Sequence, residues 1–65
     1  MYTTSHTNYG ETIITVREDA DDQVLASFLH EGGSIFPLSP RKPREALINA
    51  ALRKAGKGTR YEQEY

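Results

Sequence analysis

The sequence predicts a small α+β domain in which two helices pack on one face of a two- or three-stranded sheet, with the elements in the order β-β-α-β-α. Three observations lead to this fold class: β-branched residues at 12–16, apolar residues at helical spacing over 24–29, and an alanine-rich stretch at 46–55. A chain of 65 residues is one domain with a thin core. We assign residues 1–56 to this domain and expect residues 57–65 to form a mobile C-terminal tail.

The N-terminal part predicts a hairpin. Residues 12–16, Thr-Ile-Ile-Thr-Val, are the clearest strand in the chain. The preceding triplet Asn8-Tyr9-Gly10 suits a three-residue loop whose glycine adopts the left-handed conformation. Residues 2–7 would be the partner strand, but they are polar on both faces, so they form either a solvated edge strand or a disordered terminus.

The next segment is predicted to be the first helix. Asp19 or Asp21 can cap its start, and further carboxylates suit its first turn. Apolar residues then recur at one-face spacing, namely Val24, Leu25, Phe28 and Leu29. Gly32-Gly33 is predicted to end this helix. Residues 34–38 then favour a short strand that Pro37 confines to a sheet edge or ends early.

A second helix is predicted at 43–55. Residues 39–43 contain two prolines and form a linker, because the residue before each proline is pushed towards extended conformations. Pro43 suits a first helical turn, and Gly56 suits the end. If the first helix connects the strands at 12–16 and 34–38 as neighbours, these strands are parallel. In a dimer they could instead pair between chains.

The core has to be built from large apolar residues spread over these elements. The candidates are Ile13, Ile14, Val16, Val24, Leu25, Phe28, Leu29, Ile35, Phe36, Leu38, Leu47, Ile48 and Leu52. A core of this size stabilises a fold only marginally, and oligomerisation would add burial. The chain has no cysteine, which argues against a disulfide-stapled secreted scaffold. With no apolar run long enough to cross a membrane, we expect a cytoplasmic protein without membrane contact.

Charge is strongly polarised along the chain. Residues 41–60 carry a net charge of +6 and residues 1–40 a net charge of −5, although the whole chain sums to −1. Basic residues at this density can neutralise phosphates, and the run Ser-Pro-Arg-Lys-Pro-Arg has the composition of arms that enter a minor groove. The alternative is that bases in the last helical turn complement the helix dipole and that linker bases are merely solvated. The candidate binding residues are Arg41, Lys42, Arg44, Arg53, Lys54, Lys57, Arg60 and Tyr61.

Two functions compete on this basis. The first is a non-catalytic regulatory or adaptor protein that binds nucleic acid through the basic segment. The second is a protein-binding module that modulates or inhibits a larger protein or forms a homodimer. Its apolar and tyrosine surface would dominate binding, while charge, for example against an acidic protein surface, would set orientation and association rate. The acidic run at 18–22 could serve a dimer, although helix capping alone would also explain it. Four tyrosines outside the predicted core, Tyr61 among them, suit an interface, base stacking or cover for a thin core.

Catalysis is not expected. His6 and His30 are the only histidines, and they lack the spacing of a zinc site. Ser27 or Ser34 with His30 has no nucleophile-elbow motif, and no glycine-rich phosphate loop is present. The sequence therefore predicts neither an enzyme nor a cofactor or metal site.

Overall fold

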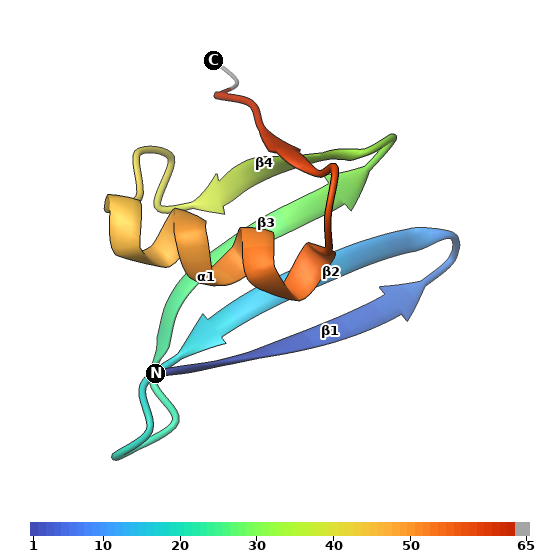
Figure 1. Cartoon of the computed structure of the whole chain (residues 1–65). Coiled ribbons are helices and arrows are strands. Elements are labelled where there is room, and N and C mark those ends of the chain that lie inside the picture. Colours follow the sequence, from blue (N-terminus) through green and yellow to red (C-terminus); the bar gives the residue numbers. More distant parts are fainter. Residues whose placement is uncertain (64–65) are drawn as a thin grey trace.

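The chain forms a five-stranded sheet covered on one face by a helix, in a computed structural model that describes residues 1–63 (Figure 1). The strands lie in the sheet in the order of the sequence, antiparallel from β1 to β4, while β5 joins β4 in parallel. The elements are β1 Tyr2–Asn8, β2 Glu11–Arg17, β3 Val24–Glu31, β4 Ser34–Ser39, α1 Glu45–Ala55 and β5 Arg60–Tyr61. The predicted architecture of two helices on two or three strands is wrong, because the segment predicted as the first helix is a strand.

That strand, β3, occupies the centre of the sheet. Ala26 and Phe28 lie opposite Val16 and Ile14 of β2, and their side chains point to the face that α1 covers. The apolar spacing over 24–29 fits both a helix face and a strand of alternating burial, and pairing with two neighbouring strands decides the outcome. The acidic residues before β3 form a turn and not a helix cap: the Asp21 carboxylate accepts the backbone N–H of Gln23 at 3.1 Å.

Two tight turns set the register of the hairpins. Gly32 and Gly33 both have positive φ, 60° and 79°, and connect β3 to β4 as a two-residue turn. Tyr9 and Gly10, with φ of 53° and 80°, do the same between β1 and β2, so the first loop is one residue shorter than predicted. Paired positive φ values match the right-handed twist of the flanking strands, which is why this turn is common in hairpins. The N-terminal hairpin is therefore formed, with β1 as an edge strand.

The fourth strand lies between β3 and β5, so residues 12–16 and 34–38 are not neighbours and the parallel pairing considered for them does not arise. Pro37 pairs with Phe28 on one side. On the other side β5 reaches only Ser34 and Ile35. Proline has no backbone N–H to donate to a neighbouring strand. On the side of Pro37 that faces away from β3, no strand of the described residues pairs with it.

The predicted second helix is confirmed as α1, which starts two residues later than expected and touches all five strands. Gly56 ends it with φ of 109°, and its N–H donates to the Leu52 carbonyl at 3.0 Å. Small residues let the helix approach the sheet closely, since Ala50 and Ala51 are buried together with Leu47. The buried core is Ile14, Val16, Ala26, Phe28, Ile35, Leu47, Ala50 and Ala51.

Several predicted core residues lie elsewhere. Val24 is 47% exposed and Leu38 is 46% exposed, both beside register shifts in the sheet. Ile13, Leu29 and Phe36 are half-buried and directly aligned across β2, β3 and β4. Because neighbouring residues of a strand point to opposite faces, this row lies on the face away from α1.

The predicted tail begins with ordered contacts. Arg60 donates its N–H to the Gly33 carbonyl at 3.1 Å, and the N–H of Glu62 donates to the Ile35 carbonyl at 2.9 Å. The Ser34 hydroxyl, nearly buried, donates to the Glu62 carboxylate at 2.6 Å. The remaining part of the predicted tail, residues 64–65, lies outside the described residues.

Candidate nucleic-acid interface

The basic segment is divided by α1 into two groups at opposite ends of the helix. Arg41, Lys42 and Arg44 lie in the linker before it, and Arg53, Lys54 and Lys57 lie in its last turn and just beyond. A helix of 11 residues is about 16 Å long, so the two groups are about that far apart. All six side chains belong to exposed residues.

The linker group has no explanation in the helix dipole. The N-terminal end of a helix carries partial positive charge, which favours acidic and not basic neighbours. Arg44 itself is the N-cap residue, in extended conformation, and it makes no capping hydrogen bond with its side chain. Its carbonyl accepts the N–H groups of Leu47 and Ile48, so the backbone and not the guanidinium supports the helix start. Arg41 likewise uses its backbone and not its guanidinium: its carbonyl accepts a hydrogen bond from the side-chain amide of Gln63 at 2.9 Å.

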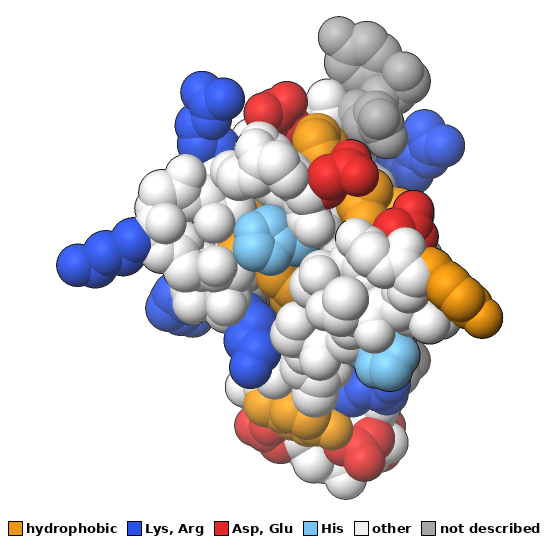
Figure 2. Space-filling model, turned by 90° about the vertical axis from the view of Figure 1, so that its right-hand side faces the viewer, with side chains coloured by type: hydrophobic (Ala, Val, Ile, Leu, Met, Phe, Trp, Pro, Cys, Tyr) orange, Lys and Arg blue, Asp and Glu red, His pale blue; other side chains and the backbone are white. Residues whose placement is uncertain are grey.

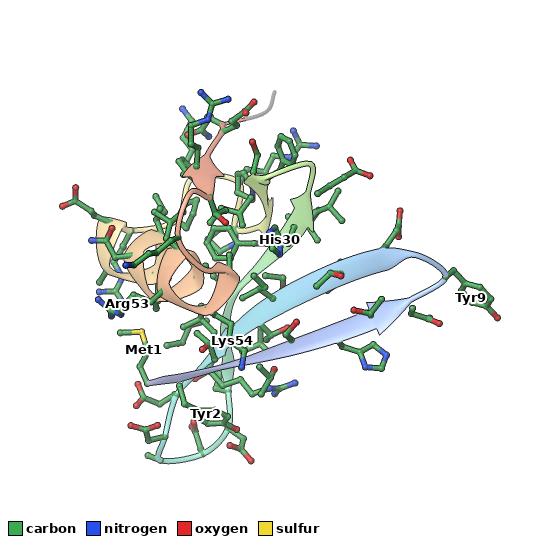
Figure 3. The ribbon with its side chains drawn as sticks, turned by 45° about the vertical axis from the view of Figure 1, so that its right-hand side comes forward. Met1, Tyr2, Tyr9, His30, Arg53 and Lys54 are labelled. Carbon is green, nitrogen blue, oxygen red and sulfur yellow. The ribbon has the colours of Figure 1, made fainter. Side chains whose placement is uncertain are left out.

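The second group does suit its position. Arg53 and Lys54 are in the last turn of α1, where the carbonyl end of the helix favours cations. Figure 3 shows the side chains of these two residues leaving the helix in different directions. Arg53, Lys57, Leu52 and Gly56 line a shallow, open depression at this end of the helix.

Acidic residues gather at a separate place, the turn between β2 and β3. There Asp19 pairs with the amino group of Met1, and Asp22 accepts the hydroxyl of Tyr2. Arg17, the base closest in sequence, donates to the backbone carbonyl of Asp22 at 2.9 Å. In Figure 2 the acidic side chains at the bottom lie at the end of the molecule where Figure 1 shows this turn. Most basic side chains project on the left, which is the side of α1.

Ion pairs within the described residues do not neutralise the two basic groups beside α1. Among residues 1–63 the ion pairs are Met1 with Asp19 and Arg60 with Glu62, the latter at 3.7 Å. None of the six bases flanking α1 has a carboxylate of the described residues within ion-pair distance. Within residues 1–63 the positive charge on the helix side is therefore not neutralised by ion pairs.

The other two predicted binding residues are set apart by β5. Arg60 aligns with Ser34, on the face away from α1, and pairs with Glu62. Tyr61 aligns with Ile35, is half-buried, and packs edge-on against Phe28 with ring centroids 6.4 Å apart. The ring of Tyr61 thus covers an end of the core, and the structure separates both residues from the groups beside α1.

The two histidines lie on different strands of the sheet. His6 lies on β1 opposite Ile13, and His30 lies on β3 opposite Ile35, on the other face of the sheet. Within residues 1–63 no three His, Asp or Glu side chains are grouped as metal ligands would be.

Comparisons with protein-family models, curated proteins and solved structures gave no match to this chain. No helix in the described part of the chain has the length and apolar character needed to cross a membrane.

Sequence reasoning missed two surfaces. One is the aligned row of Ile13, Leu29 and Phe36, and the other is the outer edge of β1. Gly32-Gly33 between two apolar segments is a hairpin signal that would have placed β3 and β4 side by side and so revealed the row. The β1 edge had a signal too, in the Thr- and Ser-rich composition of a solvated strand.

Proposed function

We propose that this chain is a non-catalytic nucleic-acid-binding protein whose contacts come from the two basic groups that flank α1. The observation that supports this best is the linker group: Arg41, Lys42 and Arg44 are exposed, lie at the helix end where the dipole disfavours cations, and have no carboxylate partner among the described residues. Positive charges at this end of a helix lower the stability of the free protein, and a polyanionic partner is the best explanation for their presence.

Both groups contact phosphates in this proposal. The exposed side of α1 between them carries Ala46 and Asn49, which are small enough to let a nucleic-acid backbone approach the helix. Glu45 is the acidic exception in the first turn. Contacts of this kind supply affinity without sequence specificity, and they release counterions.

The salt dependence of binding measures the number of contacts. If all six bases neutralise phosphates of duplex DNA, a plot of log K against log salt concentration has a slope of about −5. The experiment is a fluorescence anisotropy titration of labelled duplex DNA, single-stranded DNA and RNA at several salt concentrations. Absence of binding to all three at low salt would reject the proposal and favour a protein-binding role.

A matched pair of variants tests the location of the contacts. Arg41→Ser should make the slope shallower by about 1 and weaken binding to every sequence alike. Arg60→Ser removes the same charge from the other face, where Glu62 already pairs with it, and should leave the slope unchanged. If Arg60→Ser weakens binding as much as Arg41→Ser does, the interface does not lie beside α1.

A further inference from the structure

The outer edge of β1 is a long strand edge with no partner among the described residues. The order of the sheet places β1 at one end, paired with β2 over seven residues. The other end, β5, has two residues. An unpaired edge presents a row of backbone N–H and C=O groups that another strand can bind.

The protective devices that edge strands normally carry are missing from β1. Its sequence, Tyr-Thr-Thr-Ser-His-Thr-Asn, contains no lysine, arginine, acidic residue or proline. Its pairing with β2 runs from Tyr2 to Asn8 without a bulge. All of its residues except Thr3 are exposed, and no other strand of the described residues pairs with its outer edge.

Large apolar side chains mark the two ends of this edge. Among residues 1–63 five large hydrophobic residues are exposed; of these, Met1 and Tyr2 lie at the start of β1 and Tyr9 lies just after its end. Tyr9 is 98% exposed, and Figure 3 shows it projecting from the tip of the hairpin, far from Met1 and Tyr2. Within one chain these side chains cannot meet.

From this edge we infer that the protein forms a two-fold symmetric dimer in which β1 pairs with β1 of a second copy, antiparallel and centred on Ser5. A two-fold axis through such a pair requires one residue to face its own copy. Centring on Ser5 is the arrangement that pairs all seven residues, with Thr3 opposite Thr7 and Thr4 opposite His6 of the second copy. The same register brings Met1 and Tyr2 beside Tyr9 of the second copy at each end.

The charges of the chain agree with this arrangement. No charged side chain of β1 faces another across the new pair. The acidic turns, held against the start of each β1 by the Met1 and Tyr2 contacts, lie at opposite ends of the interface. Seven residues of strand span about 23 Å, so the two acidic turns do not repel each other strongly at physiological salt. A single ten-stranded sheet results, with both copies of α1 on one face.

A charge-swap experiment tests both the dimer and its register. In light scattering or sedimentation equilibrium over a range of concentrations, the unmodified chain should approach twice its mass of 7.3 kDa. Ser5→Lys alone and Ser5→Glu alone place like charges opposite each other and should shift the protein to the monomer mass. An equimolar mixture of the two variants should recover the dimer mass.

Ala46→Lys and Ala46→Glu serve as matched controls, because Ala46 is exposed on α1. Both controls should keep the dimer mass. Nuclear Overhauser contacts between the Met1 methyl group and the Tyr9 ring in a mixed-label sample give an independent readout. Monomer mass at every concentration, a mass beyond the dimer, or a mixture that stays monomeric would each overturn the inference.

Discussion

Ile13 and Ile14 are chemically identical neighbours on β2 that the structure places on opposite faces of the sheet, and this difference can be measured. Ile14 is 1% exposed and packs among the core residues beneath α1. Ile13 is half-buried on the face away from the helix. Replacing each by valine in turn removes one methylene and keeps a β-branched side chain, so strand propensity stays nearly constant.

The expected cost differs between the two positions. Ile14→Val should lower the free energy of unfolding by about 1 kcal/mol, the usual value for a buried Ile→Val change. For a chain of this size, 1 kcal/mol corresponds to a Tm lower by about 4–8 °C. Ile13→Val should cost about 0.5 kcal/mol or less, the low end for Ile→Val, because its half-buried side chain loses less buried surface and leaves no enclosed cavity.

Urea denaturation followed by circular dichroism is the assay, with thermal melts beside it. Both variants should keep the slope m of the unmodified protein, so that a shift in midpoint reports stability alone. Equal costs at the two positions, or a larger cost for Ile13→Val, would refute the assignment of the two faces in the free protein.

Two further predictions concern contacts at the two ends of the chain. The hydrogen bond from the Tyr2 hydroxyl to the Asp22 carboxylate raises the pKa of Tyr2 above 10, so its contribution to stability is present below pH 10 and is lost as pH rises through the raised pKa. Asp22→Asn should bring the pKa of Tyr2 back towards 10 in an NMR titration of labelled tyrosines, and an unchanged pKa would show that this contact does not persist in solution. Ser34→Ala removes the hydroxyl that donates to Glu62, and it should cost about 1 kcal/mol and speed amide hydrogen exchange at Glu62. Unchanged exchange there would mean that backbone pairing alone holds β5.

The sequence predicted the parts of the fold that local chemistry determines. The strand at 12–16 and the helix at 43–55 were recognised, the latter two residues too early, because β-branched content, proline, alanine content and glycine act over a few residues. Residues 24–31 were not, since Phe28 and Leu29 satisfy either a helical or a strand pattern until β2 and β4 are known to flank them. Asp21 shows the same ambiguity, because an aspartate oxygen that can cap a helix can equally close a turn.

The candidate site was predictable in its composition and not in its geometry. Charge along the chain pointed to residues 41–60, but only the structure shows α1 holding two basic groups apart and β5 turning Arg60 to the other face. Tyr61 looked like a contact residue because it lies outside the predicted elements, yet its ring packs on Phe28. Such long-range pairing has no signal in the local sequence.

The parallel pairing of β5 with β4 has a consequence for the order of folding. β1 to β4 form a meander whose neighbours are joined by short turns, whereas Ser34 and Arg60 meet only after the whole of α1 has been placed between them. Local pairings form faster than distant ones, so the meander should assemble first and β5 last. During synthesis the meander also leaves the ribosome before α1, with Ile14 and Phe28 still uncovered. The helix therefore buries the apolar face of the sheet late in synthesis. The newly made chain should be most prone to aggregation in the interval before α1 docks on the sheet.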